Sequence, residues 1–195
     1  FTLTKGQKKI IDTINSDLKS EFKMFRLLQG DVGSGKTIVA FLAAANVIES
    51  KNQVAFMAPT EILAKQHFYL AKKIFKNTNI IIEFISGKTD LAKKKKIQSD
   101  LAKGKINFLI GTHALFQKNI TFNKLGLAII DEQHKFGVKQ RIELSNKGGV
   151  DCDILLMSAT PIPRTLVLAF YGDMDVSKLT EKPKSRKNTI TISKP

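Results

Sequence analysis

Residues 30–37 read Gly30-Asp31-Val32-Gly33-Ser34-Gly35-Lys36-Thr37 and match the pattern G-x-x-x-x-G-K-[ST] in full. An apolar run, Phe25–Leu28, precedes this motif, and a helix-forming run, Ile38–Ala45, follows it. In such a strand, loop and helix the backbone N–H groups of the loop surround phosphate, the lysine reaches the β and γ oxygens, and the threonine hydroxyl meets Mg²⁺. The sequence therefore predicts a nucleotide-phosphate site and not a glycine-rich turn that binds nothing.

The whole loop is predicted to contribute to nucleotide binding, and Thr37 is also a predicted Mg²⁺ ligand. The helix that begins near Lys36 is expected to add the partial positive charge of its N-terminus. The predicted nucleotide-binding residues of the loop are Gly30, Asp31, Val32, Gly33, Ser34, Gly35, Lys36 and Thr37.

The composition is that of a single globular domain with an excess of basic residues. The chain has 195 residues, of which 43% are hydrophobic, enough for a sizeable core. Lys and Arg outnumber Asp and Glu by 32 to 17, and the net charge of +15 favours a polyanionic partner such as nucleic acid. The run Lys93–Lys96 fits this expectation, but a solvated helix face explains it equally well.

The apolar runs and the cysteine content predict where in the cell the protein is found. Apolar runs such as Ile38–Ala45 are far shorter than a membrane span, and no charged-then-apolar leader precedes them, so we expect no membrane association. The single cysteine, Cys152, excludes an internal disulfide, and no Cys/His cluster has metal-ligand spacing; we therefore expect a reducing, cytoplasmic setting. The chain begins at Phe1 and not at Met, which suggests that it was excised from a longer protein.

Apolar, β-branched runs alternate with helical patterns along the chain. This alternation predicts an α/β, three-layer fold with helices on both faces of a central, mostly parallel sheet. The predicted strands are Phe25–Leu28, Val54–Met57, Ile80–Phe84, Ile106–Ile110, Leu127–Ile130, Ile154–Met157 and a short β-like Thr189–Ile192; the predicted helices are Gln7–Leu18, Lys36–Glu49, Glu61–Phe75, Leu91–Lys103 and Arg164–Phe170.

The run Leu127–Ile130 leads directly into two adjacent carboxylates, Asp131 and Glu132. Parallel sheets place their ligands at the carboxyl ends of the strands. Asp131 is therefore expected to hold Mg²⁺, and Glu132 to orient and deprotonate the water that attacks the γ-phosphate. With Lys36, these residues predict an ATP hydrolase site; the alternative is a strand that ends in a charged loop.

The segment Asp131-Glu132-Gln133-His134 resembles the D-E-x-H box of superfamily 2 helicases and translocases. Other segments agree with that family in order and spacing: Leu3-Thr4 with Gln7 resembles its adenine-reading element, Ala58–Ala64 its motif Ia, and Ser158–Thr160 its motif III.

More narrowly, four segments resemble the RecG family of bacterial branched-DNA helicases; they are residues 30–37, 111–115, 131–141 and 158–166. The related transcription-repair coupling translocases usually carry a second Glu where this chain has Gln133, and this difference favours the RecG family.

The resemblance implies a RecA-like P-loop NTPase lobe with ATP and Mg²⁺ as cofactors, and it assigns further residues. Gln7 would contact the nucleotide, Gln133 and His134 would join the catalytic group, and Ser158 and Thr160 would couple ATP use to movement. Ordinary capping of strand ends is the alternative for the last four. The DNA-backbone contacts of the family map to Thr60, Gly87, Lys88, Gly111, Thr112 and His113.

In this family the lobe is one of two. We expect residues 1–180 to form the first RecA-like lobe and the basic segment 181–195 to lead toward a second lobe, which supplies the arginine finger. A wedge domain that splits DNA junctions is also expected outside this chain. Alone, the lobe is expected to be a monomer that binds ATP weakly and hydrolyses it at nearly background rates.

The resemblance thus predicts the motor lobe of an ATP-dependent helicase that remodels Holliday junctions and stalled replication forks in recombination and repair. Its expected partners are branched or forked DNA, the second lobe and wedge domain, and single-strand-binding protein. One alternative is the motor lobe of a transcription-repair coupling translocase. The other is a non-hydrolysing, ATP-dependent clamp on nucleic acid, against which the intact Asp131-Glu132 pair argues.

Overall fold

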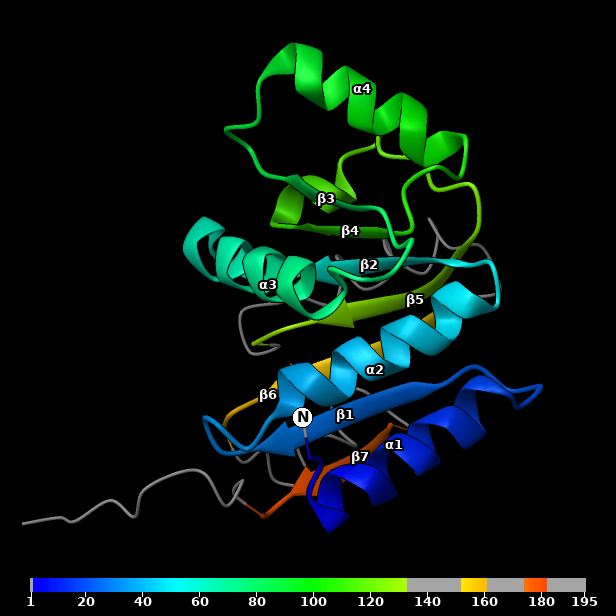
Figure 1. The fold of residues 1–195 in the computed structure, drawn as a ribbon, viewed down its shortest axis with the longest axis vertical. Helices are drawn as coiled ribbons and strands as arrows, with labels where there is room; N and C mark the ends of the chain where they lie inside the picture. The colour runs from blue at the N-terminus through cyan, green and yellow to red at the C-terminus, as the bar shows by residue number, and fades with distance from the viewer. Residues whose placement is uncertain (1, 133–151, 161–173, 182–195) are drawn as a thin grey trace, which may run out of the picture.

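The computed structural model describes residues 2–132, 152–160 and 174–181. Its centre is a seven-stranded sheet with the order β3-β4-β2-β5-β6-β1-β7, in which every pair of neighbouring strands is parallel (Figure 1). All the carboxyl ends therefore lie at one edge of the sheet. The strands are β1 (Phe25–Gly30), β2 (Gln53–Met57), β3 (Ile82–Ile85), β4 (Phe108–Gly111), β5 (Leu125–Ile130), β6 (Asp153–Ser158) and β7 (Asp175–Leu179).

Helices cover both faces of this sheet. The first three α-helices contribute to one apolar cluster and lie in front of the sheet in Figure 1, whereas the fourth packs on the opposite cluster through Ile97 and Leu101. The helices are α1 (Lys5–Leu18), α2 (Lys36–Glu49), α3 (Glu61–Ile74), α4 (Leu91–Ala102) and the short 3-10 helix η1 (His113–Phe116).

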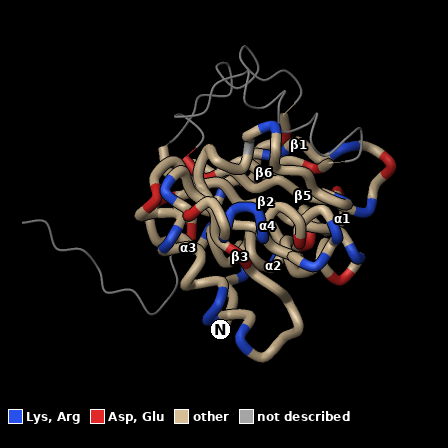
Figure 2. The backbone as a smooth tube through the Cα atoms, turned by 90° about the horizontal axis from the view of Figure 1, so that it is seen from above, with Lys and Arg blue, Asp and Glu red and all other residues tan. Residues whose placement is uncertain are grey.

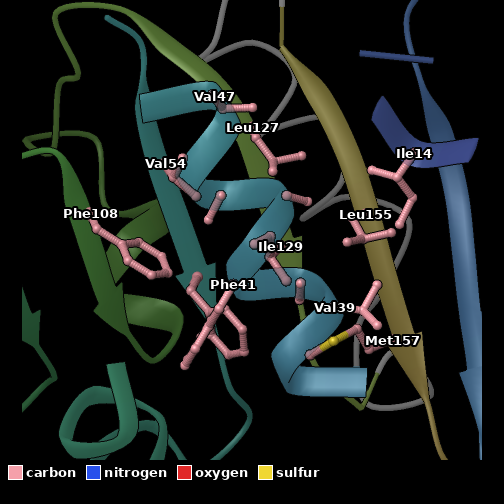
Figure 3. Packing of buried hydrophobic residues seen from close by; sticks show 14 of the residues in the cluster. Ile14, Val39, Phe41, Val47, Val54, Phe108, Leu127, Ile129, Leu155 and Met157 are labelled. Carbon is pink, nitrogen blue, oxygen red and sulfur yellow. The ribbon is translucent and has the colours of Figure 1, made fainter. Parts of the chain in front are cut away.

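The two apolar clusters alternate along the central strands. In β2, Val54 and Phe56 belong to the cluster under α2, whereas Ala55 and Met57 belong to the cluster on the other face. Figure 3 shows part of the first cluster, including Phe41 of α2. The centroid of the Phe41 ring lies 5.6 Å from that of Phe56. A strand buried on both faces is a continuous apolar run in the sequence. The predicted three-layer α/β fold is confirmed.

Strand β7 is not among the predicted strands. Ser177 and Leu179 are buried in it, but the positions between and before them are partly or fully exposed, as suits a strand at the edge of the sheet. β7 pairs with β1, and the buried Arg26 donates from Nη1 to the Ser177 hydroxyl at 2.9 Å. A polar edge strand lacks the continuous apolar run by which the buried strands were recognised.

The other predicted elements agree with the structure to within a few residues, and α2 matches its predicted range, Lys36–Glu49. The predicted helix Arg164–Phe170 and strand Thr189–Ile192 lie outside the described residues. The carboxylate of Glu181 accepts a hydrogen bond from the Gly6 N–H at 3.1 Å, so the chain still contacts α1 there. The division into 1–180 and 181–195 stays a prediction.

Cys152 lies directly before β6 and is buried. Burial raises the pKa of its thiol to about 12. Because the thiolate and not the thiol is the nucleophile, Cys152 is an inert part of the core at neutral pH.

Within the described ranges, no helix is long and apolar enough to cross a membrane.

Candidate nucleotide site and nucleic-acid loops

The residues singled out in the sequence converge on the carboxyl edge of the sheet. The strand order β3-β4-β2-β5-β6-β1 divides this edge into two adjacent halves. We call the loops after β3, β4 and β2 the DNA half, after the ligand predicted for them; they contain Ser86–Lys88, Gly111–His113 and Ala58–Thr60. We call the loops after β5, β6 and β1 the nucleotide half; they contain Asp131–Glu132, Ser158–Thr160 and Gly30–Thr37.

The loop after β1 has a conformation that requires glycine. Gly33 and Gly35 have φ angles of 82° and 90°, in the left-handed region where a side chain is strained. A Cβ atom at Gly35 would also lie only 2.2 Å from Nε2 of Gln7. Two glycines of the motif are thus explained by backbone conformation and by the close approach of α1.

The start of α2 differs from the starts of the other described α-helices. Thr4, Thr60 and Asp90 each accept a hydrogen bond from the first turn of the helix that they precede. Gly35, the corresponding residue of α2, has no side chain to do so. The first turn of α2 therefore presents N–H groups without a capping side chain, which is the condition under which a helix N-terminus binds an anion.

Lys36 lies between this loop and the carboxylates at the end of β5. Its ammonium group donates to the Gly30 carbonyl at 2.6 Å and to the Asp31 carbonyl at 3.1 Å. Desolvation by burial lowers the pKa of Lys36, and the negative charges of Asp131, Glu132 and Asp31 act in the opposite direction. The predicted phosphate-binding cation and the predicted catalytic carboxylates are therefore close enough to interact.

Asp131 is buried at the end of β5, with 9% of its surface exposed. Its N–H donates to the Met57 carbonyl at 2.9 Å, and its Oδ1 accepts from the Glu132 N–H at 3.0 Å. Glu132 has a φ angle of 53°, a left-handed conformation that costs a non-glycine residue about 1 kcal/mol. Such local strain is common at functional sites.

His67 is a residue of this site that the sequence analysis did not select. Its Nε2 lies 2.8 Å from Oδ2 of Asp131, and both side chains are 12% exposed. On α3 it shares a face with Ala64 and Ala71, which are buried three residues before and four residues after it. The available signal in the sequence was a histidine at helical spacing from two alanines of a predicted helix, Ala64 and Ala71.

Gln7 lies directly against the phosphate loop. Its Oε1 accepts from the Thr4 N–H at 3.0 Å, and its Nε2 donates to the Ser34 carbonyl at 2.9 Å. The side chain is buried and belongs to the capping box that begins α1. The structure thus brings Gln7 to the nucleotide half, while its contact with the nucleotide stays a prediction.

Ser158 and Thr160 form a compact turn after β6. The Ser158 hydroxyl accepts from the Thr160 N–H at 3.2 Å, and the buried Gln29 donates to the Thr160 carbonyl at 3.0 Å. Because Gln29 immediately precedes Gly30, this bond joins the predicted coupling segment to the phosphate loop. Gln29 was not predicted from the sequence. The available signal was its place at the end of an apolar run, directly before the phosphate loop.

In the DNA half, Thr60, Gly87 and Lys88 are exposed. The Thr60 hydroxyl accepts from the Leu63 N–H at 3.3 Å and so begins α3. The Lys88 N–H donates to the Ser86 hydroxyl at 3.3 Å, which holds the loop after β3 in a tight turn. These three residues face solvent, and their contacts with DNA stay predictions.

The loop after β4 combines a packing role with exposure. A Cβ at Gly111 would lie 2.2 Å from the Ile85 carbonyl oxygen, so the close approach of β3 requires glycine here. The Thr112 N–H donates to that same carbonyl at 3.3 Å, and His113 is exposed. The packing of Gly111 against β3 explains the glycine without any contact with DNA, whereas the contacts of Thr112 and His113 with DNA stay predictions.

Gln133 and His134, the remaining predicted catalytic residues, lie outside the described residues. In the part of the chain that is described, no group of three or more His, Cys, Asp or Glu side chains is placed to hold a metal ion. A Mg²⁺ ion would instead require the Thr37 hydroxyl, the Asp131 carboxylate and phosphate oxygens. This all-oxygen set suits Mg²⁺, which is usually bound through one or two carboxylates together with substrate phosphates.

Basic residues are spread over several elements of the surface, as the blue segments of Figure 2 show. In the run on α4, Lys93, Lys95 and Lys96 are exposed. Their exposure agrees with either interpretation of the run, a nucleic-acid contact or a solvated helix face.

Known proteins resemble this chain over nearly its full length. The family model described as DEAD/DEAH box helicase matches residues 4–168. The ATP-dependent DNA helicase RecG of Thermotoga maritima is 52% identical over 195 residues, which are 100% of this chain and 25% of that protein. RecG of Streptococcus pneumoniae is 48% identical over 191 residues, which are 98% of this chain and 28% of that protein. The chain thus spans about a quarter of the length of these relatives.

Solved structures agree. RecG bound to a three-way DNA junction superposes with a TM-score of 0.83 and 50% identity, over 96% of this chain and 25% of that one. A DEAD box protein from Methanococcus jannaschii superposes with a TM-score of 0.65 and 23% identity, over 89% of this chain and 49% of that one, which supports the fold. The resemblance to RecG that the motifs predict is confirmed.

Proposed function

The chain belongs to the DEAD/DEAH box helicase family, and from this premise we propose that it is the first RecA-like motor lobe of a RecG-type DNA helicase. In the parent protein the lobe would couple ATP hydrolysis to branch migration and regression of Holliday junctions and stalled replication forks. The observation that carries this proposal is the shared carboxyl edge, where the nucleotide half and the DNA half are adjacent.

In the proposed ATP site, each group has a role that follows from its position. Lys36 would hold the β and γ phosphates together with the uncapped first turn of α2. Glu132 would orient the attacking water and accept its proton, while Thr37 and Asp131 would hold Mg²⁺. The ion, when bound, would offset the negative charge that develops on the transferred phosphoryl group.

The fit to a phosphate ligand is supported by the loop itself. The hydroxyl of Ser34 is buried and has no hydrogen-bond partner among the described residues. A buried hydroxyl without a partner is costly, and such groups occur where a structure changes its bonding in function. Because Ser34 lies inside the motif, we infer that its hydroxyl gains a partner when the loop closes on phosphate.

The predicted DNA contacts would bind backbone phosphates without reading bases. The loops of the DNA half offer N–H groups, hydroxyls and the Lys88 ammonium, which are donors suited to phosphate oxygens. This mode of binding agrees with the net charge of +15 and would weaken as salt rises. Selectivity for branched DNA would then come from a wedge domain elsewhere in the parent protein.

The coupling role of Ser158 and Thr160 is supported by the hydrogen bond between Gln29 and the Thr160 carbonyl. A change at the phosphate loop would alter this bond and so reach the segment after β6. Gln133 and His134, which follow the end of β5, would join Ser158 and Thr160 in this coupling.

We further propose that the lobe acts as a cytoplasmic monomer whose partners are branched DNA, the second lobe, the wedge domain and single-strand-binding protein. Since an arginine finger from the second lobe neutralises transition-state charge in such motors, this lobe alone would bind ATP weakly and turn it over at close to background rates.

The transcription-repair coupling translocase is a less well supported alternative because Gln133 replaces its usual glutamate. A non-hydrolysing clamp is disfavoured because a passive switch requires neither the proposed general base, Glu132, nor its strained conformation.

Steady-state ATP hydrolysis, with and without forked DNA, tests the proposal. Background rates from this chain, and a rate stimulated by DNA when the second lobe is present on the same chain, are the expected results. The two-lobe protein with Glu132→Gln should lose the stimulated rate and keep nucleotide binding. A two-lobe protein that binds ATP and forked DNA without hydrolysis would favour the clamp instead.

A further inference from the structure

The contact between His67 and Asp131 joins α3 to the proposed metal-binding carboxylate. Nε2 of His67 lies 2.8 Å from Oδ2 of Asp131. An ionised carboxylate can only accept hydrogen bonds, so the imidazole donates its Nε2–H. Because both side chains are only 12% exposed, water competes little for this bond.

The ring of His67 is held by aromatic packing as well as by this bond. Its centroid lies 4.6 Å from that of Phe56, at an interplanar angle of 47°, and 6.5 Å from that of Phe41. Phe41 and Phe56 are themselves fully buried in the cluster under α2. The imidazole therefore has little freedom to turn, and its donor is aimed at one acceptor.

The carboxylate of Asp131 is correspondingly fixed from two directions. Oδ2 accepts from His67, and Oδ1 accepts from the Glu132 N–H at 3.0 Å. A carboxylate has about four acceptor positions, so lone pairs remain for a metal ion on either oxygen. Among the described residues, the Glu132 N–H fixes the position of Oδ1, and only the bond from His67 fixes the position of Oδ2.

We propose that His67 is a positioning residue for Mg²⁺ binding: it fixes the rotation of the Asp131 carboxylate so that a lone pair points toward the metal site beside the phosphate loop. This inference rests on the proposed role of Asp131 as a metal ligand. Partners of metal-binding carboxylates usually act this way, and their loss weakens metal affinity by about 10- to 100-fold.

A plainer explanation is that His67 is a core histidine satisfied by the nearest carboxylate. The two explanations differ in what a substitution would do. A core role predicts loss of stability alone, whereas positioning predicts a specific loss of Mg²⁺ affinity that a new donor at the same place restores.

The position of His67 also connects the two halves of the edge. α3 begins at Thr60, in the DNA half, and His67 lies two helical turns further along, at the nucleotide half.

The test compares His67→Phe, which keeps an aromatic ring but has no donor, with His67→Gln, whose Nε2 amide provides a donor at a similar reach. Binding of a fluorescent ATP analogue to this chain is measured in EDTA and then in a Mg²⁺ titration. His67→Phe should bind the analogue normally in EDTA but need about 10- to 100-fold more Mg²⁺ to tighten binding. His67→Gln should recover most of the wild-type Mg²⁺ response.

Asp17→Asn is the matched control, because it weakens the partly buried contact with Arg26 at 2.6 Å without touching the nucleotide half. It should lower the midpoint of thermal unfolding and leave the Mg²⁺ response unchanged. A wild-type Mg²⁺ response in His67→Phe would overturn the proposal, as would a response in His67→Gln as weak as that of His67→Phe.

A measurement on the wild-type chain covers the case in which the variants do not fold. Mn²⁺ added with the ATP analogue should broaden the ring resonances of His67 more strongly than those of His113. Equal or weaker broadening of His67 would place the metal away from Asp131 and overturn the proposal. Absence of nucleotide binding by the wild-type chain, both in EDTA and with Mg²⁺, would instead contradict the proposed ATP site itself, and this inference with it.

Discussion

The nucleotide half and the DNA half share one edge of one sheet, yet they are built differently. In the nucleotide half, the buried Asp131 is bonded to His67 of α3, and the Thr160 carbonyl accepts a hydrogen bond from the buried Gln29 of β1, so this half is held by bonds between distant segments. In the DNA half, Thr60 and Lys88 are exposed, and the loops are held mainly by local turns.

The difference matches the demands of the two proposed ligands, ATP and DNA. Phosphoryl transfer needs charges fixed in a site with little water, because interactions there are strong and reorganisation is costly. Binding along a DNA backbone needs donors that reach outward and meet phosphates at any sequence. The comparison predicts that substitutions in one half leave the ligand of the other half unaffected.

The largest expected effect is that of Lys36→Ala. Two hydrogen bonds from a charged donor to phosphate, each worth about 1.5–3 kcal/mol, would be lost, so nucleotide affinity should fall by about 100-fold or more. Affinity for forked DNA should stay within about twofold of wild type. Calorimetric titration measures the affinity for ATP, and fluorescence anisotropy measures the affinity for DNA. Lys124→Ala, at the opposite edge of the sheet, is the control, and an equal loss of ATP affinity there would contradict the assignment of Lys36.

Gly111→Ala tests whether part of the DNA half is built by packing. Its new Cβ would lie 2.2 Å from the Ile85 carbonyl oxygen, so the strands must shift, and overpacking of this kind costs about 1–3 kcal/mol of unfolding free energy. Gly87→Ala is the matched control, since no atom lies within 4 Å of its added Cβ, and it should change stability by less than about 0.5 kcal/mol. Urea denaturation measures both. A stable Gly111→Ala variant with weakened DNA binding would assign Gly111 to DNA instead.

Thr60→Ala separates two roles of one hydroxyl. This hydroxyl caps α3 through the Leu63 N–H, and loss of such a cap costs about 1 kcal/mol of unfolding free energy. Thr60→Ser should restore the stability to within a few tenths of a kcal/mol. Thermal unfolding followed by circular dichroism gives the comparison. Unchanged stability in Thr60→Ala would show that the cap contributes nothing and would leave DNA contact as the role of Thr60.

Lys88→Ala should have the smallest effect. An exposed charge contributes at most about 1 kcal/mol, so affinity for forked DNA should fall by about fivefold or less, and the salt dependence of binding should lose about one ion. ATP affinity should not change. Anisotropy measured over a series of salt concentrations tests this, with Lys103→Ala on the exposed end of α4 as the control. A larger loss from Lys103→Ala would move the DNA path onto α4.

The sequence was most informative where the chemistry is local. The phosphate loop needs a fixed order of glycines, lysine and threonine because successive backbone groups must face one ligand. The strands buried on both faces appear as apolar runs for an equally local reason. These features predicted the α/β fold, which the structure confirms, and a nucleotide site with carboxylates at the end of β5, whose roles stay predictions.

Contacts between distant segments required the tertiary structure. The edge strand β7 has no continuous apolar run, and its partner β1 lies far away in the sequence. His67 and Asp131 are separated by 64 residues, and Gln29 and Thr160 by 131 residues, so no local pattern marks either pair. Sequence alone determined which groups this protein carries; folding decided which of them meet, because strand order and helix packing bring together residues whose spacing in the chain contains no record of their contact.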